Sequence, residues 1–206
     1  MIGEVDEALR RLVEGAELGD ARVVLDRPHP ASPPESPGRV ALHLCAVSED
    51  IALRTDGWED IEEDGRIAFR RPVPRWYELA YEVTAVAGDA TEEHRLLDAV
   101  LRRLVLQEIL PPEHITGSLL ELGLGVPLKV ALPRPRDGHP GQAPRRPVIE
   151  VLVTAPLRPD LLVPTAPPAR TAELAIGRSG GAGERISATP GDPAMRRAVP
   201  GRPPPA

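Results

Sequence analysis

One segment, from Arg75 to Ile109, constrains the fold more than any other part of the sequence. Its first half alternates apolar and more polar residues, which is the period of a strand buried on one face. The residues on the predicted buried face are Tyr77, Leu79, Tyr81, Val83 and Ala85. Trp76, Glu78 and Glu82 alternate with them and are therefore predicted on the opposite, more polar face.

The second half of this segment predicts a long amphipathic helix. Gly88 and Asp89 break the alternation, and Asp89 followed three residues later by Glu92 is typical of a helix start. Helical spacing then predicts one buried face, formed by Leu97, Val100, Leu101, Leu104 and Val105. Pro111 and Pro112 are expected to end the helix. On this assignment a charge in place of Leu101 should unfold the domain.

The remaining patterns complete an α+β domain. A first helix is predicted from the spacing of Val5, Ala8, Leu9, Leu12 and Val13, with Gly15 at its end. Short strands are predicted at 21–26, 40–47, 51–55, 126–132 and 148–154. A charged hairpin is predicted over 56–71, with Asp64-Gly65 at its tip. We therefore expect a mixed, largely antiparallel sheet with two main helices packed on one face.

Composition divides the chain into a domain and a tail. Of the 26 prolines, 11 fall between Pro156 and Ala206, together with a glycine-rich run at 177–183. Such a segment has too little apolar surface to offset the entropy of ordering it. We predict a folded domain over residues 1–157 and a disordered Pro/Gly/Arg-rich tail over 158–206.

Charge and residue spacing argue against several classes of function. Residues 1–130 hold 25 acidic and 14 basic side chains, so the folded part repels a nucleic-acid backbone. No metal ligation is expected, because no two of the five histidines have ligand spacing and Cys45 is the single cysteine. Cys45 is expected to behave as a small buried hydrophobe in its strand. We find no nucleophile–base pair, and therefore predict a protein that is not an enzyme and needs no cofactor.

No stretch is apolar enough to span a membrane, and the acidic N-terminus does not resemble a secretion signal. A cytoplasmic protein is expected, which leaves the cell only as part of a larger assembly. Trp58 and Trp76 fit either the core or a protein interface, where tryptophan is enriched.

The ordered set of segments resembles a known family. These segments are Met1–Arg10, Leu53–Trp58, Arg71–Ala85, Glu93–Leu101 and Val151–Leu157. Together they are similar to the N-terminal domain of the tail-terminator, or cap, proteins of extracellular contractile injection systems. The resemblance covers about residues 1–157. These systems are phage-tail-like particles with a contractile sheath around an inner tube.

The resemblance implies a structural, non-enzymatic role. The family implies a sixfold ring that ends tube and sheath polymerisation at the end distal to the baseplate, with the sheath and tube proteins as partners. A ring needs a contact between two different patches of the same chain. Candidate contact residues are Trp58, Glu59, Arg70, Arg71, Trp76, Glu78 and Glu82. The alternative is an adaptor that uses its Pro-rich tail, including Pro164–Pro168 and Pro203–Pro205, as a partner ligand.

Overall fold

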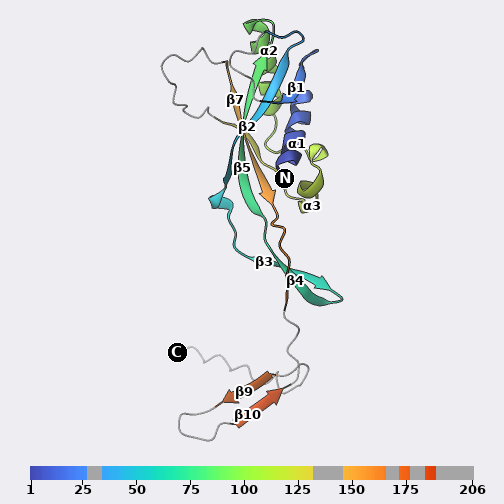
Figure 1. The fold of residues 1–206 in the computed structure, drawn as a ribbon, viewed down its shortest axis with the longest axis vertical. Coiled ribbons are helices and arrows are strands. Elements are labelled where there is room, and N and C mark those ends of the chain that lie inside the picture. The colour runs from blue at the N-terminus through green and yellow to red at the C-terminus, as the bar shows by residue number, and fades with distance from the viewer. Residues whose placement is uncertain (27–33, 132–145, 166–171, 177–183, 189–206) are drawn as a thin grey trace, which may run out of the picture.

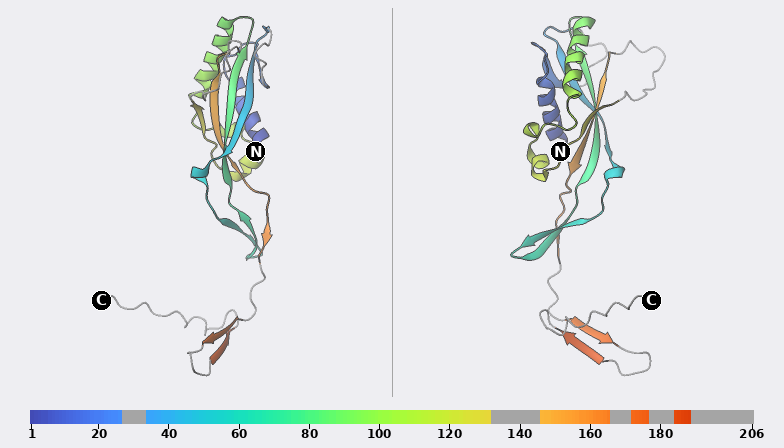
Figure 2. Two further views of the ribbon diagram at one scale, coloured as in Figure 1. Left: turned by 60° about the vertical axis from the view of Figure 1, so that its left-hand side comes forward. Right: turned by 180° about the vertical axis from the view of Figure 1, so that it is seen from behind.

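The computed structural model describes residues 1–26, 34–131, 146–165, 172–176 and 184–188. Its largest part is a five-stranded sheet with the order β1-β2-β5-β7-β6, covered on one face by two main helices (Figures 1 and 2). Only β1 and β2 are parallel, and the other neighbours are antiparallel. The expected α+β architecture is confirmed. The strands are β1 (Arg22–Leu25), β2 (Arg39–Glu49), β5 (Arg75–Val86), β6 (Leu128–Ala131) and β7 (Ile149–Leu157).

The helices are α1 (Ile2–Glu14), α2 (Ala90–Leu104) and the short α3 (Gly117–Leu122), with single 3₁₀ turns η1 (Ile51–Leu53) and η2 (Pro112–His114). Within the described residues, no helix is both long enough and apolar enough to cross a membrane.

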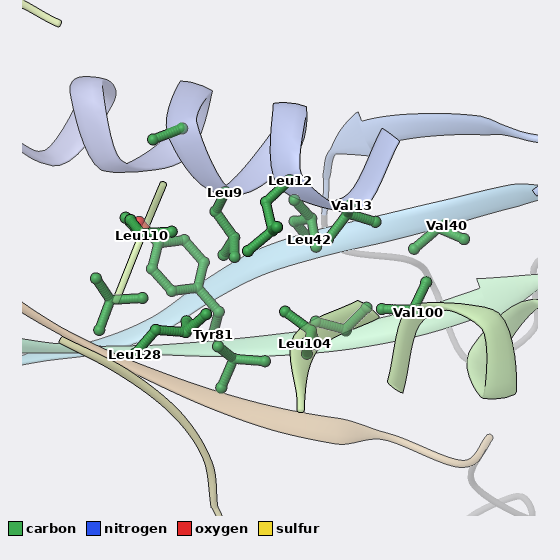
Figure 3. Packing of buried hydrophobic residues seen from close by; sticks show 14 of the residues in the cluster. Leu9, Leu12, Val13, Val40, Leu42, Tyr81, Val100, Leu104, Leu110 and Leu128 are labelled. Carbon is green, nitrogen blue, oxygen red and sulfur yellow. The ribbon is translucent and has the colours of Figure 1, made fainter. Parts of the chain in front are cut away.

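The core lies between α1, α2 and the central strand β5. The predicted apolar stripe of α1 is completely buried and belongs to one core cluster with Leu79, Tyr81 and Val83 of β5. Figure 3 shows Leu9 and Leu12 of the stripe on the side of α1 that faces Tyr81. Burial of each leucine and valine of the stripe contributes about 1.5–3 kcal/mol, so this packing holds the helix in place. On β5, Ala80, Thr84 and Val86 of the opposite face are buried as well, which the alternating pattern did not predict.

Polar contacts join α1 to the elements around it. The Tyr81 hydroxyl donates a hydrogen bond to Asp6 Oδ1 at 2.7 Å, and burial together with that carboxylate raises the pKa of Tyr81. The Glu4 carboxylate accepts hydrogen bonds from Ser118 N and Oγ and from Leu119 N, at 2.8–3.2 Å. Burial opposes ionisation of Glu4, but these donors outweigh it and lower its pKa.

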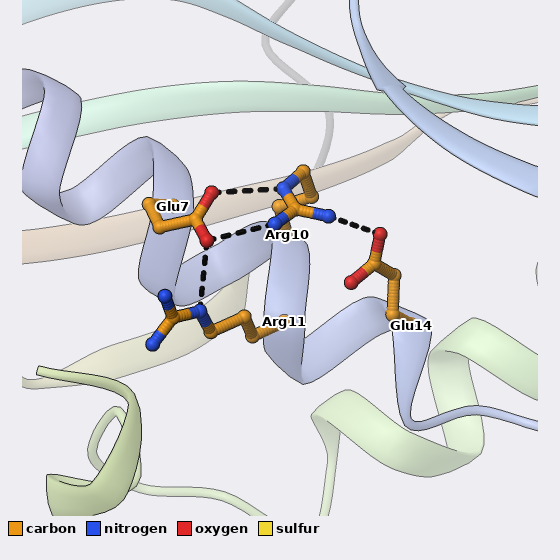
Figure 4. Close-up of polar contacts among 4 residues, drawn as sticks. All are labelled: Glu7, Arg10, Arg11 and Glu14. Carbon is orange, nitrogen blue, oxygen red and sulfur yellow. Dashed lines mark hydrogen bonds and ion pairs between the residues drawn. The ribbon is translucent and has the colours of Figure 1, made fainter.

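The solvent side of α1 carries a network of ion pairs. Glu7 accepts hydrogen bonds from both Arg10 and Arg11, and Arg10 also bonds Glu14 (Figure 4). The hydrogen bonds from Arg10 and Arg11 lower the pKa of Glu7 to about 2. Because these pairs are spaced three and four residues apart, they reinforce the helix locally.

The buried face of α2 differs from the prediction. Asp89 is the N-cap as expected, since its Oδ1 accepts from Glu92 N at 2.9 Å. The buried residues, however, are Leu96, Leu97, Val100 and Leu104, while Leu101 is 37% and Val105 63% exposed. Two adjacent apolar stripes satisfy the same helical spacing, and packing against β5 and α1 selects the one that contains Leu96. The expectation that Leu101 is a core residue was wrong.

Two further predictions were wrong at the end of β2. Residues 51–53 form the 3₁₀ turn η1 and not a strand, because Asp50 caps the turn by accepting a hydrogen bond from Ala52 N. Cys45 is exposed, because a β-bulge between Leu44 and Ala46 turns it out of the alternation. Its thiol donates to Ala80 O at 3.1 Å.

Part of the predicted tail forms strands. β8 (Val163–Pro164) pairs with an earlier strand, and β9 (Ala172–Ile176) pairs with β10 (Glu184–Ala188) as an antiparallel hairpin. Residues 166–171, 177–183 and 189–206 of that segment lie outside the described residues, as does most of the Pro-rich sequence that the adaptor hypothesis uses. The boundary between the folded domain and the tail at residue 157 stays a prediction.

Candidate interaction surface

A three-stranded sheet extends from one end of the five-stranded sheet. It consists of β3 (Trp58–Glu63), β4 (Arg66–Pro72) and β8, in the order β3-β4-β8. We call residues 56–72 and 158–165 the arm; it projects beyond the end of the helix layer (Figures 1 and 2). None of these residues is buried, so the arm has no core of its own.

The hairpin of the arm forms as the sequence predicted. Asp64 and Gly65 both have positive φ, 53° and 73°, which matches the twist of the flanking strands in a two-residue turn. Arg70 Nε bonds Asp60 Oδ1 and Arg71 Nε bonds Glu59 Oε2, both at 2.7 Å. These cross-strand ion pairs join the acidic limb to the basic limb and help to set the register.

The two ion pairs lie on opposite faces of the arm. One face, which we call the Trp58 face, carries Trp58, the Asp60–Arg70 pair, Ile67 and Val163. The register places Trp58 opposite Pro72, and Val163 opposite Arg70. A bulge after Ile61 shifts the register, so that Ile67 pairs with Glu62. The side chain of Ile67 therefore lies on the Trp58 face, and not on the face that carries Phe69. The other face carries Ile61 opposite Phe69, and the Glu59–Arg71 pair.

The chain after β7 fastens the arm along the edge of β4. β8 pairs through Val163 and Pro164, Thr165 N donates to Ala68 O at 3.0 Å, and the Thr165 hydroxyl bonds the same carbonyl at 3.1 Å. Arg158 Nη2 lies 3.8 Å from Glu59 Oε2, so this carboxylate contacts an arginine of β4 and one of the chain after β7. Sequence reasoning missed this pairing, because two residues with a proline give no strand signal.

The base of the arm is held by charged and backbone contacts. Glu49 Oε1 lies 3.3 Å from both Arg54 Nε and Arg75 Nη1, and Asp50 N donates to Trp76 O at 2.9 Å. Trp76 is therefore at the junction between the arm and the five-stranded sheet, where it is half-buried. Arg54 and Glu49 were not among the predicted contact residues, although their opposite charges close to the turn were visible in the sequence.

Apart from Trp76 at the junction, the predicted contact residues fall into two groups in the structure. Trp58, Glu59, Arg70 and Arg71 belong to the arm. Glu78 and Glu82 lie instead on the helix-free face of the central strand, where Glu78 is 3.7 Å from Lys129 Nζ and Glu82 stands in register between His43 and Glu150. The predicted set is thus not one continuous surface.

Within the described ranges, no group of three or more His, Cys, Asp or Glu side chains is placed to hold a metal ion. The arm is a three-stranded sheet without a buried residue, and we therefore take it as the candidate contact region of the chain.

Comparison with known proteins identifies the family. Residues 4–169 match the family described as the Pvc16 N-terminal domain. The chain belongs to this family. The Pvc16 N-terminal domain match includes the arm with β8 and ends before β9. No curated protein matches the chain.

Two solved structures have a similar fold. One is the sheath/tube terminator of an extracellular contractile injection system, PVC, in its extended state: it has a TM-score of 0.58 and 18% identity, over 87% of this chain and 65% of that one. The other is the tube-terminating cap of the anti-feeding prophage, AFP, with a TM-score of 0.53 and 17% identity, over 85% and 60%. The matched region therefore spans somewhat less than two thirds of each of these proteins.

Proposed function

We propose that this chain is a structural subunit of the tail terminator of a contractile injection particle. In this role six copies form a ring that ends polymerisation of the inner tube and the sheath at the end distal to the baseplate. The observation that carries the proposal is the match of residues 4–169 to the Pvc16 N-terminal domain, whose fold this chain has in common with two terminators.

The shape of the chain is compatible with this role. A closed ring uses a heterologous contact, in which one patch of each subunit binds a different patch of the next. A projecting arm without buried residues is suited to such a contact, because it gains its missing packing from a neighbour. The sheath and tube proteins of the particle are the other proposed partners, and no bound cofactor is needed.

Deletion of the gene in the cell that makes the particles tests the proposal. We expect electron microscopy to find tubes of variable length with open distal ends, and a plasmid copy of the gene to restore closed tubes of uniform length. A cryo-EM map of the restored particles should place the chain at the distal end. Closed, uniform particles from the deletion strain would refute the proposed function.

A further inference from the structure

The arm continues the three middle strands of the five-stranded sheet, which together with its helices we call the body. The middle strands are β2, β5 and β7 in this order, and the arm has the order β3-β4-β8. Along the chain β2 leads into β3, β4 into β5, and β7 into β8 (Figures 1 and 2). Three neighbouring segments of the chain therefore cross between the body and the arm.

Each of the three strands is interrupted where it crosses. The interruptions are residues 50–57, 73–74 and 158–162, and we call them together the joint, which includes the base of the arm. None of the residues in the joint is buried. Because no side chain of the joint belongs to the core, little packing resists a change in its backbone angles.

The backbone hydrogen bonds of the two sheets end on either side of Pro74. On the body side, Asp50 N donates to Trp76 O, and on the arm side Val73 N donates to Gly57 O. Pro74 lies between these two bonds and has no N–H of its own to donate. Among the described residues, no backbone hydrogen bond joins the body to the arm across this position.

An ion pair spans the joint. Arg158 directly follows β7, and its Nη2 lies 3.8 Å from Glu59 Oε2 of β3. This distance is too long for a hydrogen bond, and Arg158 Nε has no hydrogen-bond partner in the part of the chain that the structure describes. Ion pairs that are partly exposed to water are weak and are screened by salt. The contact can therefore open while both sheets stay folded.

We propose that the joint is a hinge, at which the three strands of the arm tilt together relative to the body, and that the Arg158–Glu59 ion pair restrains this tilt. Hinges in proteins are short segments at the ends of elements that absorb changes in φ and ψ. β8 moves with the arm, because it pairs with β4 and because Thr165 N bonds Ala68 O.

The hinge is a property of the single chain and does not rest on the proposed ring. Its consequence for binding is that the arm meets a partner at more than one angle, while the core of the body is unchanged.

Distances between two spin labels on the full-length chain test the hinge. Glu62→Cys in the arm and Glu121→Cys on α3 give an arm–body pair, in a chain whose native thiol is removed by Cys45→Ser. Asp20→Cys with Glu121→Cys gives a body pair as the reference. All four replaced residues are exposed. Pulsed electron paramagnetic resonance measures the distance distributions on dilute, monomeric protein, because contact with another copy would restrain the arm.

The arm–body distribution is expected to be wider than that of the body pair, and Arg158→Gln should widen it further. Arg70→Gln is the matched control, because it removes the ion pair with Asp60, which lies within the arm and does not span the joint. Salt at about 1 M, where the Debye length is about 3 Å, should widen the arm–body distribution of the chain that keeps Arg158. The same salt should have no further effect on Arg158→Gln, and the body pair should stay unchanged throughout.

Two results would overturn the inference. An arm–body distribution as narrow as that of the body pair, with and without Arg158→Gln, would show that the arm is a rigid extension of the sheet. Equal widening by Arg158→Gln and Arg70→Gln would show that the arm loosens internally and does not tilt at the joint. If Arg158→Gln lowers the melting temperature, the salt series on the chain that keeps Arg158 decides alone, and a distribution that salt leaves unchanged would refute the restraint.

Discussion

At the scale of single residues, Gly117 lies in the contact between α1 and α3, where a side chain fits only if the Glu4 carboxylate moves. Gly117 has φ of +59°, and a Cβ there would lie 2.4 Å from Glu4 Oε1. Glu4 is the residue whose carboxylate accepts from Ser118 and Leu119, so the close approach belongs to the contact itself. Glycine is needed for two separate reasons, its backbone conformation and its lack of a side chain.

Substitutions of two glycines separate these reasons. Gly123 also has positive φ, +63°, but a Cβ at that position would meet no atom within 4 Å. Gly123→Ala should therefore lower the free energy of unfolding by about 1–2 kcal/mol, from backbone strain alone. Gly117→Ala should lower it by at least about 1 kcal/mol more, measured by urea denaturation. In combination with Glu4→Ala the loss should be smaller than the sum of the two; additive losses would argue against the clash.

A second residue-scale prediction concerns the hydrogen bond between Tyr81 and Asp6. Tyr81 is completely buried, and its hydroxyl is 2.7 Å from the carboxylate. Tyr81→Phe should lower the free energy of unfolding by about 1.5–3 kcal/mol, because the hydrogen bond between the buried hydroxyl and the Asp6 carboxylate is lost. A double-mutant cycle with Asp6→Ala measures the coupling, with the half-buried Tyr77→Phe as the control. A coupling energy near zero would contradict the assignment.

At the scale of elements, the sequence predicts those whose signals are local. The alternation around Tyr81, the periodicity of α1 and the turn at Asp64-Gly65 each identified an element correctly, since each pattern lies within one segment. Features set by distant contacts were not predicted. Cys45 is turned outward by a bulge, and β8 is a strand only because the edge of β4 is next to it.

The buried face of α2 is also determined by distant contacts, and the difference between the predicted and the observed face can be tested. Leu96 and Leu101 are leucines of one helix, but Leu96 is fully buried and Leu101 is not. Leu96→Ala should lower the free energy of unfolding by about 2–5 kcal/mol, from lost burial and the cavity left behind. Leu101→Ala should lower it by less than about 1 kcal/mol. Thermal and urea denaturation of both variants measure these losses. Equal losses would show that Leu101 is a core residue, as the helical spacing of the sequence predicted.

The residues of the arm were predictable only in part, because some of them are brought together by contacts that are distant in the sequence. The opposite charges of the two hairpin limbs pointed to Glu59, Arg70 and Arg71, and Trp58, which the structure shows to be exposed, was singled out by residue type. Ile67 and Val163 were missed, because a bulge and a non-local strand pairing bring them to the Trp58 face. Glu78 and Glu82 share a pattern with Trp76, but they belong to a different part of the sheet.

At the scale of the whole molecule, the chain combines a well-packed body with an arm that lacks a core. The body holds all the residues that are buried in the described part of the chain, and the arm is joined to it at Glu49, Asp50 and Trp76. Stability of the body and association through the arm are therefore expected to respond to different changes. β8 belongs to the arm, to which it contributes Val163, although it follows the core strand β7 in the chain.

Two truncations test this separation and the role of the tail. A chain that ends at residue 169, where the family match ends, keeps β8 and the whole arm. One that ends at residue 157 loses the β8 pairing and Val163, but keeps every residue that is buried in the described ranges. Both should melt at the temperature of the full chain. The longer truncation should form the same ring, and the shorter one should associate more weakly, as measured by light scattering. Full association by the shorter chain would show that β8 is dispensable, and loss of association by the longer one would assign the contact to residues after 169.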